Sequence, residues 1–425
     1  MKRLLLLLLA LASPAAAWEA DSTHAGLTEN AALSAKLHAA LASAHGRTLG
    51  LYESLTVGKP DAPALYAKLA LLAPTGGFVP DGKGRQTALS WLVAGAVIAD
   101  VPADAGTHHF QSAAVDWISA PGNDMSLARF ASELFASASA RTRAERDEHL
   151  ALALLCAGAL VHVVQDMGSP SRAHGDLSDH MSALGDGRAD RGSRFEHLAT
   201  LLYGRVGLPP SVAAVVHVHA REFVADLAGR VASRWLSSTR LPRLTRVPPH
   251  ATFGDIRQAI ERSWPVAAPR PRGTIDLEAA SPSDGALLQD EQGLCLARVR
   301  LDGERMTFAP DDKCTAEQLA TILPEVAGYS TGFLDWLFRG TLRVERGAVV
   351  TERKLGAGSL WLFAEDKNGN RAAMSTRTIT AALAGDELAQ VATPPPGTTK
   401  IVAVFRGADD ATEEIVAVGE AAWSK

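Results

Sequence analysis

The stretch LALALLCAGALVHVVQDMGSPSRAH, which runs from Leu150 to His174, decides the fold. Its first dozen residues are apolar on every side, a pattern typical of a buried helix. The same stretch then carries His162, Asp166 and His174. A buried charge without a partner costs several kcal/mol, so these side chains need a hydrogen-bond network, an ion pair or a metal ion.

His162 and Asp166 are four positions apart, so both side chains point from one face of the helix. A histidine hydrogen-bonded to an aspartate is a commoner origin of such a pair than a metal site. Pro170 ends the helix soon afterwards and can bring His174 toward the same pocket. The pair alone leaves the structural and the metal-binding interpretations open.

Three other short patterns contain ionisable residues. Asp100 ends an apolar segment, and His109 follows nine residues later, with His108 as a rival by position. His24 stands near the start of the first expected helix, and Glu196 begins another helix in GSRFEHL. Taken singly, these residues are typical of a surface loop, an exposed helix position and a helix N-terminus.

The composition is that of a globular protein with two or three domains. The chain has 425 residues, of which 47% are hydrophobic and 21% charged. A formal net charge of −5 gives no support to a broad nucleic-acid-binding surface, which is normally basic.

The N-terminal sequence MKRLLLLLLALASPAAA predicts a signal peptide over residues 1–17. It has two basic residues, an apolar run too short to span a bilayer, and small residues before the expected cleavage site. Cleavage after Ala17 would make Trp18 the first mature residue. We therefore expect a secreted or periplasmic protein without a transmembrane segment. In such a protein Cys295 and Cys314 can form a disulfide, which the sequence leaves open.

The apolar periodicity predicts a mainly α fold. Helical patterns fill the chain from Ser22 to about Leu236 and return in CTAEQLATILPEVAGYSTGFLDWLFRG. Between them, about 239–314, lies a Pro/Arg-rich segment that we expect to be an irregular insertion. After Gly340 the pattern becomes β-rich, with an Asn-Gly hairpin signal in EDKNGN. We expect a helical domain over 18–340 and a small β-sandwich over 341–425.

Taken together, the separate patterns resemble a known family. Trp18, THAGLTENAAL, GAVIAD…HHF, HVVQDMGSP…H and FEHL occur in an order similar to that of the zinc-dependent phospholipase C and single-strand-specific nuclease superfamily. The resemblance covers roughly Trp18 to Tyr203, and LPEVAGYSTGFLDWLFRG is similar to the closing helix of bacterial members.

The resemblance implies up to three zinc ions. One ion would take Asp100, His109, His162 and Asp166. A second would take the amine and carbonyl of Trp18, with His24 and a bridging Asp166. A third would take His174 and Glu196. Nitrogen and carboxylate ligands of this kind suit zinc.

Two departures from the family pattern affect the third ion. Gly192 stands where the family usually has a histidine, four residues before the final acid. We take His180 as the substitute ligand, with Asp176 and His197 as further candidates. The spacing from Asp166 to His174 is also two residues longer than in related phospholipases.

The resemblance implies a zinc-dependent phosphodiester hydrolase, with a phospholipid as the favoured substrate. Zinc polarises phosphoryl oxygens and lowers the pKa of bound water toward about 7. Asp100 would act catalytically by orienting or deprotonating that water. The C-terminal domain would provide peripheral membrane contact, and no obligate protein partner is implied.

Two alternatives remain open. A single-strand-specific nuclease would need basic and aromatic surfaces, but aromatic residues make up only 6% of the chain and its net charge is negative. A zinc-stabilised binding protein without catalysis is supported mainly by Gly192. Turnover of a phosphodiester would separate this binding protein from the two enzymes.

Overall fold

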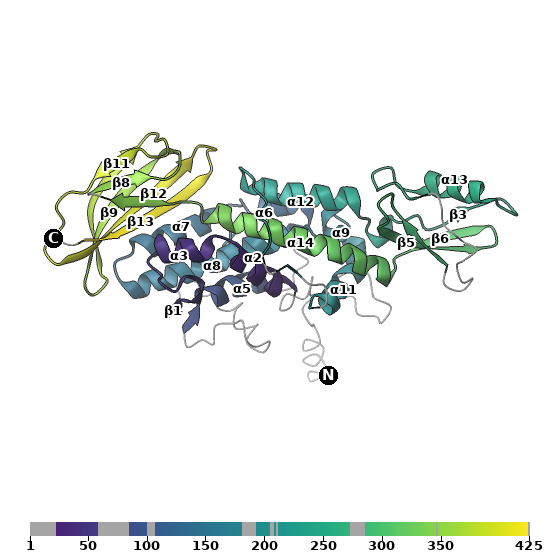
Figure 1. Cartoon of the computed structure of the whole chain (residues 1–425), viewed down its shortest axis with the longest axis horizontal. Coiled ribbons are helices and arrows are strands. Elements are labelled where there is room, and N and C mark those ends of the chain that lie inside the picture. Colours follow the sequence, from purple (N-terminus) through teal and green to yellow (C-terminus); the bar gives the residue numbers. More distant parts are fainter. Residues whose placement is uncertain are drawn as a thin grey trace, which may run out of the picture.

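The computed structural model describes residues 23–57, 85–99, 107–180, 193–204, 208–209, 211–272, 285–345 and 347–423. These residues form three parts along the long axis of the molecule (Figure 1). A helical domain occupies the middle, a β-sandwich lies at one end, and a small α/β module lies at the other. The predicted fold class, a helical domain followed by a β-sandwich, is confirmed.

The apolar stretch forms α8 (Arg143–Asp166), the central helix of the helical domain. It begins at a capping box in which the Thr142 side chain accepts the Glu145 N–H and the Glu145 side chain accepts the Thr142 N–H. Every residue from Leu150 to Asp166 is buried. Among the described helices, α8 alone is long and apolar enough to cross a membrane by length and composition. Because 89% of its most apolar window is buried inside the protein, α8 has the environment of a core helix.

The described part of this domain contains other helices besides α8, several of which pack directly against it. They are α2 (Ala25–Ser34), α3 (Leu37–Ser43), α5 (Ala88–Ile98), α6 (Gln111–Trp117), α7 (Leu127–Ser139), α9 (Pro170–Ala173), α10 (Leu177–His180), α11 (Arg194–Leu202), α12 (Ala220–Arg234) and α14 (Asp312–Leu337). A short hairpin pairs β1 (Ser54–Thr56) with β2 (Arg85–Thr87). Short 3₁₀ turns form at η3 (Gly50–Tyr52) and η5 (Thr107–His109).

Helices α5 and α8 approach each other so closely that glycine is required at the contact. A Cβ atom on Gly158 would lie 2.0 Å from the carbonyl oxygen of Leu92, and one on Gly95 would lie 2.1 Å from that of Leu155. These distances are shorter than any real Cβ contact, so a side chain at either position would push the helices apart. The two glycines therefore fix where α8 lies.

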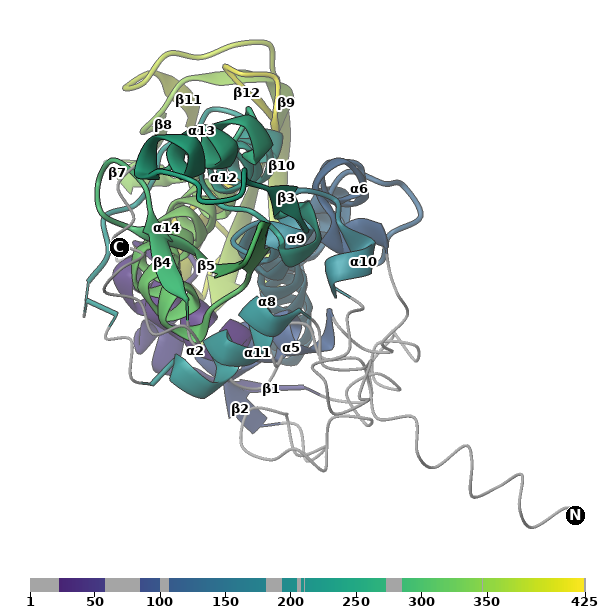
Figure 2. The same cartoon turned by 90° about the vertical axis from the view of Figure 1, so that its right-hand side faces the viewer.

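The segment 239–314, expected to be irregular, is instead largely folded as a module. It contains η6 (Ser238–Arg240), β3 (Thr245–Arg246), α13 (Phe253–Ser263), β4 (Ala286–Gln289), β5 (Cys295–Asp302) and β6 (Arg305–Ala309). The strands form an antiparallel sheet in the order β3-β6-β5-β4, whose inner face packs with α13 around a separate apolar core. Alternation along β5 buries Ala297 and Val299, whereas Arg298 is only partly buried and Arg300 is exposed. Figure 2 views the molecule from the end that carries this module.

A disulfide joins the module to α14. Cys295 of β5 is bonded to Cys314 in the first turn of α14, so the pairing that the sequence left open is made. Cys156, within α8, is a buried free cysteine, and burial raises the pKa of its thiol to about 12. It therefore serves as a small apolar side chain of the core.

The C-terminal strands form two packed sheets. The strands are β7 (Leu342–Glu345), β8 (Ala348–Thr351), β9 (Leu355–Asp366), β10 (Arg371–Ile379), β11 (Glu387–Gln390), β12 (Thr398–Asp409) and β13 (Glu414–Ala422). One sheet has the order β10-β9-β12-β13 and the other β11-β8-β7. Leu362 and Phe405 face the sandwich core, whereas Phe363 and Val404 join the core of the helical domain. Trp361 lies against Phe135 of α7, with ring centroids 4.8 Å apart.

We predict that Gly158→Ala lowers the free energy of unfolding by about 1–3 kcal/mol, because the new methyl group overpacks the α5–α8 contact. Gly229→Ala is the matched control, since Gly229 lies within α12 and a Cβ there would meet nothing within 4 Å. The control should raise stability by about 0.5–1 kcal/mol. Urea unfolding of both variants measures the difference, and equal stability of the two would contradict the packing argument.

Candidate metal centre

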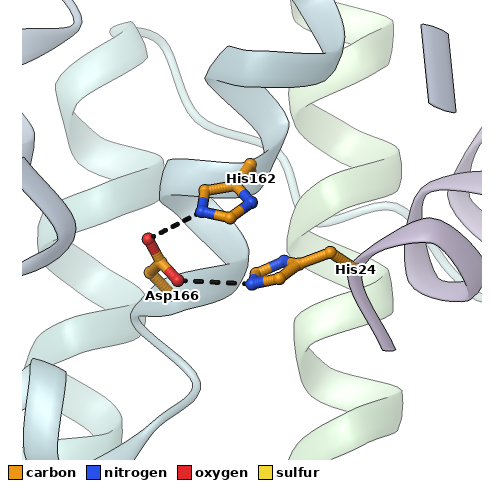
Figure 3. Close-up of side chains that lie close together, drawn as sticks. All are labelled: His24, His162 and Asp166. Atoms are coloured by element: carbon orange, nitrogen blue, oxygen red, sulfur yellow. Dashed lines mark ion pairs between the residues drawn. The ribbon is translucent and has the colours of Figure 1, made fainter. Parts of the chain in front are cut away.

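Three histidines converge on the carboxylate of Asp166, the last residue of α8. His109, at the end of η5, places Nδ1 2.7 Å from Asp166 Oδ2. His162, one turn earlier on α8, places Nε2 3.3 Å from the same oxygen. His24, which directly precedes α2, places Nε2 3.4 Å from Oδ1. Figure 3 shows His162, which is on the same helix as Asp166, and His24, which stands at the start of α2, both facing the carboxylate.

The cluster is buried, yet Asp166 remains ionised. Asp166, His24 and His162 are each 0% exposed, and His109 is 6% exposed. Burial would by itself raise the pKa of Asp166, but the charge of Arg172 and the neighbouring imidazoles hold it well below its usual range. Asp166 therefore offers an anionic oxygen ligand on each side of the carboxylate.

The donor atoms of the cluster fit a zinc ion. One ligand atom from each of His24, His162 and Asp166 lies within 4.8 Å of the other two. His109 adds a further imidazole on the Oδ2 side of the carboxylate. Imidazole nitrogen and carboxylate oxygen are the ligands that zinc takes in proteins, so residues of this chemistry can hold the ion that the sequence predicts.

Gln165 is a member of the cluster that the sequence analysis missed. It is fully buried, and its amide nitrogen donates to Thr28 Oγ1 at 3.0 Å. Its amide oxygen consequently faces His24 Nδ1, at 2.7 Å. With that oxygen as acceptor, Nδ1 carries the proton of the ring and Nε2, which faces Asp166, carries the lone pair. Gln165 thus holds His24 in the tautomer and orientation that a metal ligand needs.

Arg172 is a second residue that the sequence analysis missed. It lies on α9, and its Nη1 is 3.2 Å from Asp166 Oδ1. Its Nε donates to Glu196 Oε1 at 2.8 Å. The other carboxylate oxygen of Glu196 accepts the Ser193 N–H at 2.8 Å, within the capping box that begins α11. Phe110 lies under the guanidinium, with its ring centroid 5.8 Å away.

His174, which the resemblance implies as a ligand of the third ion, is hydrogen-bonded to the protein backbone. It follows α9, and its Nε2 is 2.7 Å from the backbone carbonyl of Trp235, to which it donates. Within the described part of the chain, no group of three potential ligands includes His174 or Glu196. The third ion implied by the resemblance stays a prediction.

Other predicted residues lie partly or wholly outside the described residues. Trp18, Asp100 and Gly192 lie outside, and so does the side chain of His180 at the end of α10.

Of the two neighbouring histidines, His109 contacts Asp166, whereas the ring of its rival His108 stacks on Trp117 with centroids 4.9 Å apart. Asp176, a further candidate for the third ion, accepts a hydrogen bond from Ser237 Oγ at 2.6 Å.

Comparisons with known proteins give only distant similarity. The alpha toxin from Clostridium absonum matches over 95% of this chain and 98% of its own, with a TM-score of 0.30 and 11% identity. Alpha-toxin of Clostridium perfringens from avian strain SWCP matches over 97% of this chain and all of its own, with a TM-score of 0.30 and 9% identity. No protein-family model and no curated protein sequence matches. Similarity at this level carries no argument about function, which has to come from the site.

We predict that Gln165→Met weakens zinc affinity by about 10–100-fold, because His24 loses the acceptor that orients its ring. Competition with a chromogenic chelator measures the affinity. Gln318→Met is the control, since Gln318 is also buried but donates to the Cys295 carbonyl, where the module meets α14. Equal zinc affinity in Gln165→Met and the wild type would show that Gln165 does not orient a ligand.

Proposed function

We propose that the protein is an exported, zinc-dependent phosphodiester hydrolase of the phospholipase C type. The observation that carries the proposal is the convergence of three imidazole nitrogens on one buried, ionised carboxylate, each within 3.4 Å of an oxygen of Asp166. The order of motifs in the sequence supports the same assignment. His24 and His109, which the resemblance implies as ligands, both reach the Asp166 carboxylate.

The residues of the chain have distinct tasks in this proposal. Zinc, when bound, supplies a Lewis acid for a phosphoryl oxygen and lowers the pKa of water. His24, His109, His162 and Asp166 would hold the zinc ions, and Gln165 orients His24. Asp166 stays ionised, so its negative charge offsets the positive charge at this buried site. Asp100 is our proposed base, and Trp18 a proposed ligand through its free amine.

A phospholipid is the substrate that we propose, with the β-sandwich in contact with the membrane surface. Trp361 has no part in that contact, because it packs against Phe135 of the helical domain. The outer surface of the sandwich, away from α7, would have to supply it. A net charge of −5 makes a single nucleic-acid strand the less favourable substrate.

We predict that purified protein hydrolyses bis(4-nitrophenyl) phosphate, loses this activity on chelation and regains it with zinc. Phosphatidylcholine vesicles should then release a phosphorylated head group, while single-stranded DNA should remain intact under the same conditions. Cleavage of DNA in place of lipid would favour the nuclease alternative. Zinc-loaded protein that turns over none of the three substrates would contradict the enzymatic function and favour a zinc-stabilised binding protein.

A further inference from the structure

Arg172 is a buried cation held between two buried acids. Its side chain is 1% exposed, and those of Asp166 and Glu196 are 0% exposed. Nη1 lies 3.2 Å from Asp166 Oδ1, and Nε donates to Glu196 Oε1 at 2.8 Å. Burying a guanidinium costs several kcal/mol unless charged partners and hydrogen bonds compensate, so this position is specific rather than incidental.

We propose that the guanidinium of Arg172 takes the place of the third zinc ion. On this assignment, which rests on the proposed zinc-dependent function, the chain binds two zinc ions around Asp166 and none at Glu196. The guanidinium is a permanent cation that neutralises Glu196 and one side of Asp166. A dication beside the same two carboxylate oxygens would be repelled by it at short range.

The two residues implied as ligands of the third ion already have other partners. Glu196 uses Oε1 for Arg172 and Oε2 for the Ser193 N–H that begins α11. His174 donates its Nε2 proton to the Trp235 carbonyl, so this nitrogen has no lone pair to offer. Coordination of a metal ion by either residue would break these hydrogen bonds. Loss of the bond to Glu196 would also deprive the buried Arg172 of one of its two charged partners.

Arg172 also positions the carboxylate that the proposed zinc ions share. Its contact is with Oδ1, the oxygen that faces His24, while Oδ2 faces His109 and His162. Holding Oδ1 fixes the rotation of the carboxylate, so that each oxygen is presented to a different set of imidazoles. Arg172 is therefore a positioning residue of the site.

Zinc bound per chain, measured by elemental mass spectrometry at saturating zinc, tests the proposal. The wild type should bind two ions, and Glu196→Gln should also bind two because Glu196 is no ligand. Arg172→His should bind three, because it removes the fixed charge and adds an imidazole beside two freed carboxylates. Arg172→Lys is the matched control, which keeps a charge but cannot bridge both acids, and should remain at two.

Three ions in the wild type, with one lost in Glu196→Gln, would overturn the proposal. So would folded Arg172→His protein, checked by circular dichroism, that binds no more zinc than Arg172→Lys. If Arg172→His does not fold, the wild type and Glu196→Gln decide alone, since Gln keeps the capping box of α11. A wild type that binds no zinc overturns the proposed function and this inference with it, whereas a third ion at Glu196 overturns this inference only.

Discussion

The negative charge of Asp166 is the constraint on which the rest of the site depends. It stands at the end of a helix whose preceding sixteen positions, from Leu150 to Gln165, are all buried, and its own side chain has no exposure to water. An ionised carboxylate in such a place is tolerable only where positive charge and hydrogen-bond donors surround it. Arg172 and the imidazoles provide that environment, and a metal ion would add to it.

The groups around Asp166 come from distant parts of the sequence and meet because α8 is held rigidly. Gly95 and Gly158 let α5 and α8 approach to backbone contact, and Thr142 fixes where α8 begins. At its beginning α8 also reaches the β-sandwich, where Arg146 donates to the carbonyl of Gly369 at 2.8 Å. A site on the last turn of so well packed a helix is positioned more precisely than one on a loop.

The sequence predicted those parts of the structure that follow from local pattern. Unbroken apolarity predicted α8, and helical spacing placed His162 and Asp166 on one face; both are found. The segment after Pro210 was expected to be helical, yet α12 begins only at Ala220. A tertiary contact overrides the helical pattern in this segment. The Val215 N–H donates to the Gly328 carbonyl of α14, and this bond replaces a helical hydrogen bond.

Gln165 and Arg172 were missed for a related reason. A single glutamine in an apolar helix has no periodic signal, because its role depends on Thr28 and His24, more than a hundred positions away. Arg172 follows a helix end in a run of small residues, where a charged side chain is usually solvated. Its significance depends on Glu196, which is brought to it by the start of α11. The β-strands of the module escaped prediction because the Pro and Arg content of the segment concealed their short alternation.

The central claim is that Asp166 is the ligand shared by the zinc ions, and the zinc content of Asp166→Asn tests it most directly. Asparagine keeps the size and one oxygen but removes the charge that allows two dications to share one carboxylate. At saturating zinc, Asp166→Asn should lose both ions, whereas His24→Ala should lose one. If Asp166 only orients His162, its replacement would weaken affinity by about 10–100-fold and full occupancy would return in excess zinc. Full zinc occupancy in Asp166→Asn would contradict the shared-ligand assignment.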